Sequence, residues 1–582
     1  MRADDPLIVQ ADRSLLVDLH SPRYEAARAG LARFAELEKS PEHMHTYRLS
    51  PLALWNAAAS GMTADEITGI LREYSRYPLP QNVLAEIVDL TARWGKIVLT
   101  AGPEGRLRIG FANISLAAMA RNHQTLSLIL EPLSDPLAFI VPPAWRGTVK
   151  QALLKLGHPV DDRAGFTPGR PLAVALRETS ATGAPFALRP YQRDAVRAFT
   201  SGAAGDHAGG HGVVVLPCGA GKTLVAMAAM AELATETLVL VTNVTAARQW
   251  IAELLDKTTL TADQVGEYSG DKKEIRPVTV ATYQILTKKI KGAFPHFEKL
   301  GGHEFGLIVY DEVHLLPAPV FRLTAEIQTK RRLGLTATLI REDGLEGEVF
   351  SLIGPKRFDV PWKEIEAQGF IAEATCYELR VALPPDRRTV YDAAEAQAQH
   401  QIAAANPAKL EQAARLCADH AGASILVIGA YLEQLAAAAK RLGAPLITGE
   451  TPQRERERLL GGFRSGAIPV LILSRVGNFS IDLPDASVCI QISGTFGSRQ
   501  EEAQRLGRIL RPKSDGRPAL FYSLVTRDTV DQRFAMNRQL FLTEQGYRYY
   551  IEEIGVAPIV ERETSGATIL PFVARATGTE NE

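Results

Sequence analysis

Short apolar runs recur through the second half of the chain, and each is followed by a helical or loop segment. The first set occupies residues 213–217, 237–242, 277–282, 306–311 and 332–338, and the second occupies 423–430, 444–448, 469–474, 486–493 and 518–525. Buried strands that alternate with helices are typical of a parallel sheet covered by helices on both faces. The two sets therefore predict two α/β domains in tandem, over residues 188–357 and 405–550.

The first part of the chain has a different pattern. Residues 1–125 are rich in Ala and Leu, and their apolar positions mostly follow a helical period, which predicts a mostly helical N-terminal domain. Within it, residues 54–74 predict two helices, the second capped by Thr63 with Glu66 at capping-box spacing. Residues 92–111 predict a β-hairpin instead.

A small mixed α/β module is predicted between the N-terminal domain and the first α/β domain, over residues 126–187. Two apolar runs, 126–131 and 137–142, resemble strands, and residues 145–157 resemble a helix.

Two further segments complete the predicted organisation. Residues 358–404 are expected to form a linker with a short helical segment, because residues 392–416 are helical in composition and rich in Ala and Gln. Residues 551–582 are expected to be a partly disordered C-terminal tail.

Composition limits the function classes only in part. A chain of 582 residues is too long for one core, and its net charge of -1 means that any contact with nucleic acid must come from local basic patches. The four cysteines form no CxxC pair. No apolar run reaches membrane-spanning length and no signal sequence is visible, so we expect a cytoplasmic protein without a membrane partner.

A phosphate-binding loop is predicted where the first α/β domain begins. The stretch VVVLPCGAGKTLVAMAAM reads as strand, loop and helix, although Leu216 replaces the first glycine of the usual pattern. Gly219 and Gly221 let backbone N–H groups face an anion. Lys222 would neutralise the β- and γ-phosphates, and Thr223 would ligate Mg²⁺. The remaining predicted nucleotide-binding residues of this loop are Pro217, Cys218 and Ala220.

A pair of carboxylates ends a buried strand in EFGLIVYDEVHLL, about ninety residues further on. Alone, Asp311 and Glu312 would read as two solvated acids. Together with the phosphate loop they predict an ATP site, in which Asp311 holds Mg²⁺ and Glu312 orients and deprotonates the attacking water.

The second α/β domain lacks a phosphate loop but contains EEAQRLGRILR. On a helix Gln504, Arg508 and Arg511 fall on one face. The two arginines are predicted to meet the charge that develops on the γ-phosphate held by the first domain.

Several of these motifs resemble those of superfamily 2 helicases. The likeness rests on LRPYQRDA, GAGKT, DEVH, TAT, VGNFSIDLP and QRLGRILR, in that order along the chain. The chain is similar in particular to the XPB family of DNA repair helicases, because LGLTATLIREDG contains the triplet Arg341, Glu342 and Asp343 that is typical of that family. The likeness covers most of residues 6–550.

The resemblance implies more than the residues show. It implies two tandem RecA-like domains and an ATP- and Mg²⁺-dependent DNA helicase that moves 3′ to 5′ in DNA repair. It implies that Arg189 and Gln192 bind the nucleotide, with Gln192 at the adenine edge. It also implies that residues 126–187 correspond to a damage-recognition module and that the helical segment between the two α/β domains is a thumb.

Residues that contact DNA, or couple it to ATP, are predicted at the ends of strands and in nearby loops. Thr242, Asn243 and Thr282 are placed to bind phosphates, and residues 287–292 form a basic cluster. The other predicted members of this group are His314, Thr336, Thr338, Arg341, Glu342, Asp343 and Asp482.

Two function classes stay open on the sequence. One is a helicase that separates DNA strands. The other is a translocase or remodeller that moves on duplex DNA without processive unwinding, coupled to a nuclease or another repair partner. We expect single-stranded, forked or damaged DNA as the partner, a repair nuclease as a further candidate, and a monomer or weak oligomer.

Overall fold

The computed structural model describes most of the chain. The described residues are 4–39, 43–164, 169–201, 209–217, 219–290, 294–313, 329, 331–337, 346–360, 362–474, 486–494, 518–544, 547 and 549–554. Among these residues, no helix is both long and apolar enough to cross a bilayer.

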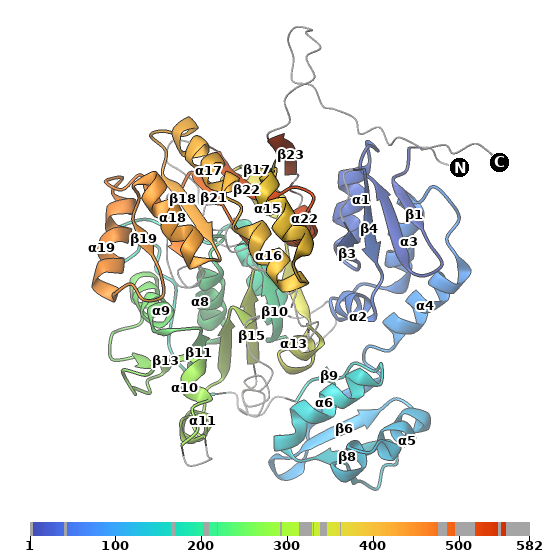
Figure 1. Cartoon of the computed structure of the whole chain (residues 1–582). Coiled ribbons are helices and arrows are strands. Elements are labelled where there is room, and N and C mark those ends of the chain that lie inside the picture. Colours follow the sequence, from blue (N-terminus) through green and yellow to red (C-terminus); the bar gives the residue numbers. More distant parts are fainter. Residues whose placement is uncertain are drawn as a thin grey trace, which may run out of the picture.

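The N-terminal domain combines the predicted helices with a sheet that was not predicted (Figure 1). The capping box is confirmed, because Thr63 and Glu66 exchange side-chain and backbone hydrogen bonds at the start of α3. The sheet is antiparallel with the order β1-β2-β4-β3. The elements are β1 (Leu7–Val9), β2 (Ser14–Asp18), α1 (Tyr24–Leu31), β3 (Glu36–Lys39), β4 (Met44–Arg48), α2 (Pro51–Ala59), α3 (Ala64–Tyr74) and α4 (Gln81–Ala92).

A five-stranded sheet follows, with the order β7-β8-β6-β5-β9. The predicted hairpin is confirmed as β5 and β6, which are antiparallel. Because β6 also pairs with β8, this sheet crosses the boundary predicted at residue 125. The elements are β5 (Ile97–Ala101), β6 (Leu107–Phe111), α5 (Ile114–Asn122), η2 (Leu126–Leu128), β7 (Glu131–Pro132), β8 (Ala138–Val141), α6 (Arg146–Lys155) and β9 (Asp161–Asp162).

The strand predicted over residues 126–131 is wrong. Leu126, Ile129 and Leu130 are buried, whereas Leu128 is 86% exposed. Burial at positions i, i+3 and i+4 is the spacing of a helical turn, and the segment begins as the 3-10 helix η2.

The first α/β domain contains a seven-stranded sheet in which every neighbouring pair is parallel. Its order is β12-β13-β11-β14-β15-β10-β16, and all five predicted strands are present. The strands are β10 (His211–Val215), β11 (Thr237–Val241), β12 (Val265–Tyr268), β13 (Val278–Thr282), β14 (Leu307–Asp311), β15 (Arg331–Thr336) and β16 (Lys356–Asp359). The helices are α7 (Pro190–Thr200), α8 (Lys222–Leu233), α9 (Val244–Lys257), α10 (Tyr283–Leu286), α11 (Pro295–Gly301) and α13 (Glu346–Leu352).

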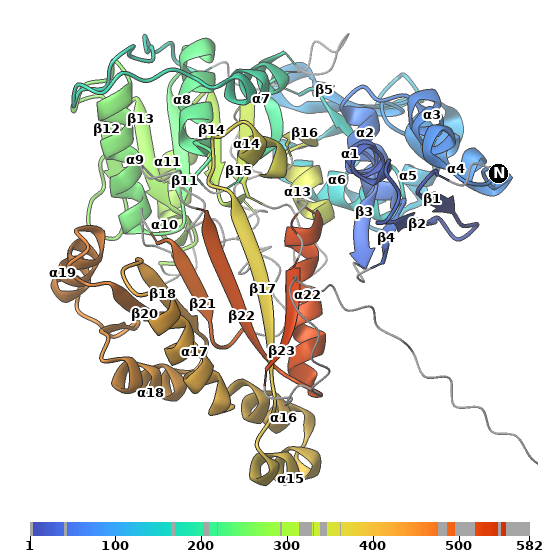
Figure 2. The same ribbon diagram turned by 90° about the horizontal axis from the view of Figure 1, so that it is seen from above.

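A second parallel sheet has the order β19-β20-β18-β21-β22-β17-β23. It lies in a second domain next to the first α/β domain (Figure 2). The five predicted strands are again present. The strands are β17 (Ala374–Val381), β18 (Ile425–Gly429), β19 (Leu446–Ile447), β20 (Val470–Ser474), β21 (Val488–Gln491), β22 (Ala519–Thr526) and β23 (Tyr549–Ile554). The helices are α14 (Trp362–Ala367), α15 (Pro385–Ala393), α16 (Ala396–Ala404), α17 (Ala408–Asp419), α18 (Leu432–Leu442), α19 (Gln453–Arg464) and α22 (Val530–Glu544). The predicted fold class, two tandem α/β domains with parallel sheets, is thus confirmed.

Two limits of this domain differ from those predicted. Strand β17 lies inside the segment expected to be a linker, 358–404, yet it pairs with β22 along its whole length. The helical part of that segment is confirmed as α15 and α16. At the other end, β23 continues to Ile554, beyond the boundary predicted at residue 550.

The N-terminal domain is joined to the edge of the first parallel sheet. At edge strand β16, the Lys356 N–H donates to Asn56 Oδ1 at 2.9 Å, and Arg357 Nη1 donates to the Ala59 carbonyl at 3.0 Å. Both partners lie in or at the end of α2. An edge strand exposes backbone groups that need partners, and here the N-terminal domain supplies one of them.

Candidate functional site

The phosphate loop, residues 217–221, joins β10 to α8 as the sequence predicts. Gly219 and Gly221 have φ of 80° and 78°, in the left-handed region that favours glycine. A Cβ on Gly221 would lie 2.4 Å from Gln192 Nε2, so a larger residue there would displace the Gln192 amide. Gly221 is also the N-cap of α8, and Lys222 and Thr223 are the first two residues of that helix.

Side chains of helix α7 hold the phosphate loop by hydrogen bonds. The Tyr191 hydroxyl and Gln192 Nε2 both donate to the Ala220 carbonyl, at 2.9 and 2.8 Å. Gln192 Oε1 accepts from the Arg189 backbone N–H at 2.9 Å, and Gln192 is only 1% exposed. In this arrangement both polar atoms of the Gln192 amide bind backbone groups of the protein, and its contact with the adenine stays a prediction.

Arg189 connects the same region to the chain that enters the second α/β domain. Its Nη1 donates to the Tyr191 hydroxyl at 3.1 Å and to the Phe370 carbonyl at 3.0 Å. Its guanidinium also lies over the Phe370 ring, 4.8 Å from the centroid. Phe370 lies between α14 and β17, in the chain that enters the second α/β domain. Arg189 therefore connects this segment to α7, and α7 in turn binds the phosphate loop.

Asp311 and Glu312 meet Lys222 as predicted. Lys222 Nζ lies 3.7 Å from Glu312 Oε1, with side-chain exposures of 11% and 25%. Glu312 has a φ of 49°, a left-handed conformation that is uncommon for a non-glycine residue and occurs preferentially at functional sites. Its backbone N–H donates to Asp311 Oδ1 at 3.1 Å.

Two aromatic residues hold Asp311 from neighbouring elements. Trp250 Nε1 donates to Asp311 Oδ2 at 2.8 Å, and the Tyr283 hydroxyl donates to the Asp311 carbonyl at 2.8 Å. Burial raises the pKa of the Tyr283 phenol well above its usual value, so this hydroxyl keeps its proton.

The charges of the site favour a bound cation. Burial raises the pKa of the Asp311 carboxyl to about 6, the Glu312 carboxylate adds to the rise, and the Trp250 hydrogen bond opposes it. The Lys222 charge also opposes the rise but does not cancel it, so the carboxylate form would gain from further positive charge. A divalent cation beside Asp311 would supply that charge, and Mg²⁺ prefers oxygen ligands. Asp311 and the Thr223 hydroxyl therefore fit Mg²⁺ bound with the phosphates of a nucleotide.

The predicted DNA contacts lie at two strand ends, residues 242–243 after β11 and residue 282 of β13, which we call the DNA-side strand ends. Asn243 caps α9, because its Oδ1 accepts from the Ala246 N–H at 2.9 Å, and its Nδ2 donates to Thr242 Oγ1 at 3.1 Å. Thr282 is buried, which leaves its side chain little contact with solvent. In the basic cluster beyond it, Lys288 and Lys289 are exposed.

Thr336 is fully buried at the end of β15, and its carbonyl accepts from the Leu216 N–H at 3.0 Å. It therefore lies beside the phosphate loop rather than on the surface. Ten other predicted site residues fall outside the described residues, so their roles stay predictions: Cys218, His314, Thr338, Arg341, Glu342, Asp343, Asp482, Gln504, Arg508 and Arg511.

Sequence reasoning did not identify Trp250, Tyr283 or Tyr191 as members of the site. The hydrogen bond between Trp250 and Asp311 joins residues 61 positions apart, and no local sequence pattern predicts such a contact. For Tyr191 a signal was present, because it adjoins Gln192 in LRPYQRDA.

Comparison with known proteins agrees with this geometry. Three family models match: "ERCC3/RAD25/XPB C-terminal helicase" over residues 365–563, "Helicase conserved C-terminal domain" over 7–133, and "Type III restriction enzyme, res subunit" over 185–341. The "DNA 3'-5' helicase XPB" of Kineococcus radiotolerans is 53% identical over 548 residues, which cover 94% of this chain and 96% of that protein. The protein of the same name from Mycobacterium tuberculosis is 51% identical over 551 residues, covering 94% and 98%. A "Putative DNA 3'-5' helicase Rad25" of Halobacterium salinarum is 36% identical, covering 92% and 85%. The chain thus belongs to the XPB family of DNA 3′–5′ helicases.

Proposed function

We propose that this protein is an ATP-dependent DNA helicase or translocase that moves 3′ to 5′ and acts in DNA repair. The observation that carries the proposal is the meeting of Lys222, Asp311 and Glu312 at the ends of β10 and β14. Two carboxylates and a lysine beside a phosphate loop are the parts that a nucleotide triphosphatase requires. The membership in the XPB family supports DNA as the polymer on which the motor acts.

Each residue of the site receives a role from its position. Lys222, at the start of α8, neutralises the phosphates, and the N–H groups of the phosphate loop bind them. Thr223 and Asp311 would hold Mg²⁺, which would supply charge stabilisation at the phosphates. Glu312 orients and deprotonates the attacking water, and its carboxylate lies near Lys222. Arg508 and Arg511 complete the site from the second domain, and this assignment rests on the sequence alone.

Single-stranded, forked or damaged DNA is the proposed partner of the DNA-side strand ends. The exposed Lys288 and Lys289 lie directly beyond Thr282, where they add positive charge near the phosphate backbone. A repair nuclease partner and a monomeric or weakly oligomeric state stay predictions from the family resemblance.

The test is ATP hydrolysis titrated with single-stranded DNA, duplex DNA, forked DNA and RNA. Lys222→Ala should abolish turnover. Glu312→Gln should retain nucleotide binding and lose hydrolysis, because removing one such group costs about 3 kcal/mol of barrier or more. Glu304→Gln is the matched control, since it makes the same chemical change in an exposed carboxylate that pairs with Arg170. Wild-type hydrolysis by Glu312→Gln would show that the assigned base is wrong.

The alternative, translocation on duplex DNA without processive unwinding, needs a separate measurement. Strand displacement from a forked substrate and displacement of a third strand from a duplex are compared in the same preparation. ATP-dependent displacement of the third strand without fork opening would favour the translocase.

A further inference from the structure

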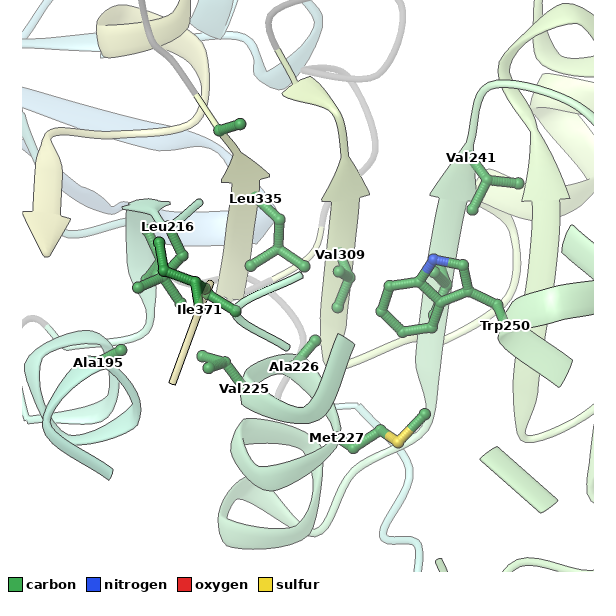
Figure 3. Close-up of a cluster of buried hydrophobic side chains, with 14 of the residues drawn as sticks. Ala195, Leu216, Val225, Ala226, Met227, Val241, Trp250, Val309, Leu335 and Ile371 are labelled. Carbon is green, nitrogen blue, oxygen red and sulfur yellow. The ribbon is translucent and has the colours of Figure 1, made fainter. Parts of the chain in front are cut away.

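Trp250 is the one side chain of α9 that hydrogen-bonds to Asp311 among the residues the structure describes. Its indole N–H donates to Asp311 Oδ2 at 2.8 Å. In Figure 3 the Trp250 side chain extends from α9 toward the strand that carries Val309, two residues before Asp311. The bond therefore spans from a helix on one face of the sheet to the end of β14.

The geometry fixes the direction of this hydrogen bond. Trp250 is only 3% exposed and belongs to the largest hydrophobic cluster, together with Met227 and Val309. A close-packed indole cannot turn its N–H elsewhere unless the helix itself moves. The second oxygen of Asp311 accepts from the Glu312 N–H. Both carboxylate oxygens are thus held by donors, and each keeps a further lone pair for a metal ion.

The hydrogen bond from Trp250 also connects Asp311 to the place where α9 begins. The helix begins at the Asn243 cap, at one of the DNA-side strand ends. Trp250 follows Asn243 by seven residues, which is two turns or about 10 Å along the helix axis. Because a helix moves as a unit, a displacement of its first turn also displaces the indole.

The other DNA-side strand end is connected to the same residue. Tyr283 directly follows Thr282, and its hydroxyl donates to the Asp311 carbonyl at 2.8 Å. The two helices that leave the DNA-side strand ends therefore each bond to Asp311, one to its side chain and one to its backbone.

We propose that Trp250 is a positioning residue, which orients the Asp311 carboxylate for the metal and transmits to it the movement of α9 when DNA binds. The inference rests on the proposed function, in which Asp311 is a metal ligand and the strand ends at 242–243 and 282 contact DNA. It predicts that losing the indole N–H weakens metal binding and reduces the stimulation of ATP hydrolysis by DNA.

The matched pair of variants is Trp250→Phe and Trp55→Phe in the full chain. Trp55 is 5% exposed in the N-terminal domain, and its indole N–H forms no hydrogen bond within the described part of the chain. Both variants exchange a buried indole for a phenyl ring, but only Trp250→Phe removes a donor to Asp311. Substitution at 250 by 3-benzothienylalanine, which keeps the shape and replaces the N–H by sulfur, separates the hydrogen bond from the packing if Trp250→Phe does not fold.

Metal binding is measured directly, with Mn²⁺ titrated by electron paramagnetic resonance in the presence of ADP. Loss of a group that orients a metal ligand typically weakens the metal by about 10- to 100-fold. We therefore expect at least about tenfold weaker Mn²⁺ binding in Trp250→Phe and wild-type binding in Trp55→Phe. Equal affinity in the two variants would overturn the positioning role.

Transmission is measured by ¹⁹F nuclear magnetic resonance of protein labelled with 5-fluorotryptophan. The chain has five tryptophans, and the signal lost in Trp250→Phe identifies residue 250. We expect this signal to shift when forked DNA is added without nucleotide, and we expect the DNA stimulation of hydrolysis to fall in Trp250→Phe. An unmoved signal in protein whose hydrolysis is stimulated by DNA would overturn the transmission. Absence of any DNA stimulation in the wild type would instead count against the proposed function, while the Mn²⁺ comparison would still decide the positioning role.

Discussion

Metal binding by Asp311 should weaken steeply as the pH falls below 6. Burial, and then the neighbouring Glu312 carboxylate, raise the pKa of Asp311 to about 6. The proton competes with the metal for the carboxylate, so the apparent dissociation constant grows by the factor 1 + 10^(pKa − pH). This factor is about 1.1 at pH 7 and about 11 at pH 5, whereas a carboxyl with the usual pKa of about 3.9 would give about 1.1 even at pH 5.

The assay is the Mn²⁺ affinity of the protein with ADP between pH 5 and pH 8. The nucleotide phosphates also bind protons, so the Mn²⁺ affinity of ADP alone is measured at each pH and only the ratio is interpreted. Asp311→Asn should give weaker binding with a flat ratio, because its amide does not titrate. Glu312→Gln removes a negative neighbour, so the pKa of Asp311 should fall and the inflection should move to lower pH. A wild-type ratio that stays constant from pH 7 to pH 5 would refute the reasoning.

Three further predictions concern other parts of the chain. Arg508→Ala or Arg511→Ala should lower turnover by roughly a thousandfold with unchanged nucleotide affinity; full activity of either variant would contradict the assignment. Alanine at all three positions of 341–343 should lower strand separation far more than DNA-stimulated hydrolysis, measured on one forked substrate, and equal losses would mean that the triplet only supports the ATP site. In the second domain, Lys409 and Asp531 are almost completely buried with Nζ and Oδ2 2.6 Å apart. Lys409→Met should cost this domain about 3–5 kcal/mol, because it removes a cation from a buried carboxylate; thermal unfolding detects the loss, and adding Asp531→Asn should recover part of it.

The strand ends that carry the chemistry were predictable from the sequence. Strand β14 is apolar throughout and ends in Asp311, and β10 leads directly into a glycine-containing loop and a helix. These signals are local, since each strand and the loop after it are contiguous in the chain. Their meeting in space then follows from the parallel sheet, which places the carboxyl ends of its strands along one edge.

Strand β17 was not predictable in the same way. It contains Glu378 and Arg380, which argue against a central strand in a sheet that is covered on both faces. In the structure Arg380 Nε donates to Glu378 Oε1 at 2.6 Å, and Gln539 of α22 donates to the other oxygen. Arg380 thus compensates the charge of Glu378, while the other Glu378 oxygen is satisfied by a residue more than 150 positions away, a contact that no local pattern can supply.

The order of strands in the first sheet places Asp311, the proposed metal ligand, between the strand ends proposed to contact DNA and the phosphate loop. Across the sheet, edge strand β12 is followed by β13 and β11, whose ends are proposed to contact DNA, then by β14 with Asp311, then by β15, and then by β10, which leads into the phosphate loop. The intervening β15 is bonded to that loop, because its Thr336 carbonyl accepts from the Leu216 N–H. A displacement that passes from strand to strand across the sheet would therefore reach β14 before β10. The bonds from Trp250 and Tyr283 to Asp311 lie on this path, so Asp311, the proposed metal ligand, would be the first residue of the proposed ATP site that such a displacement moves.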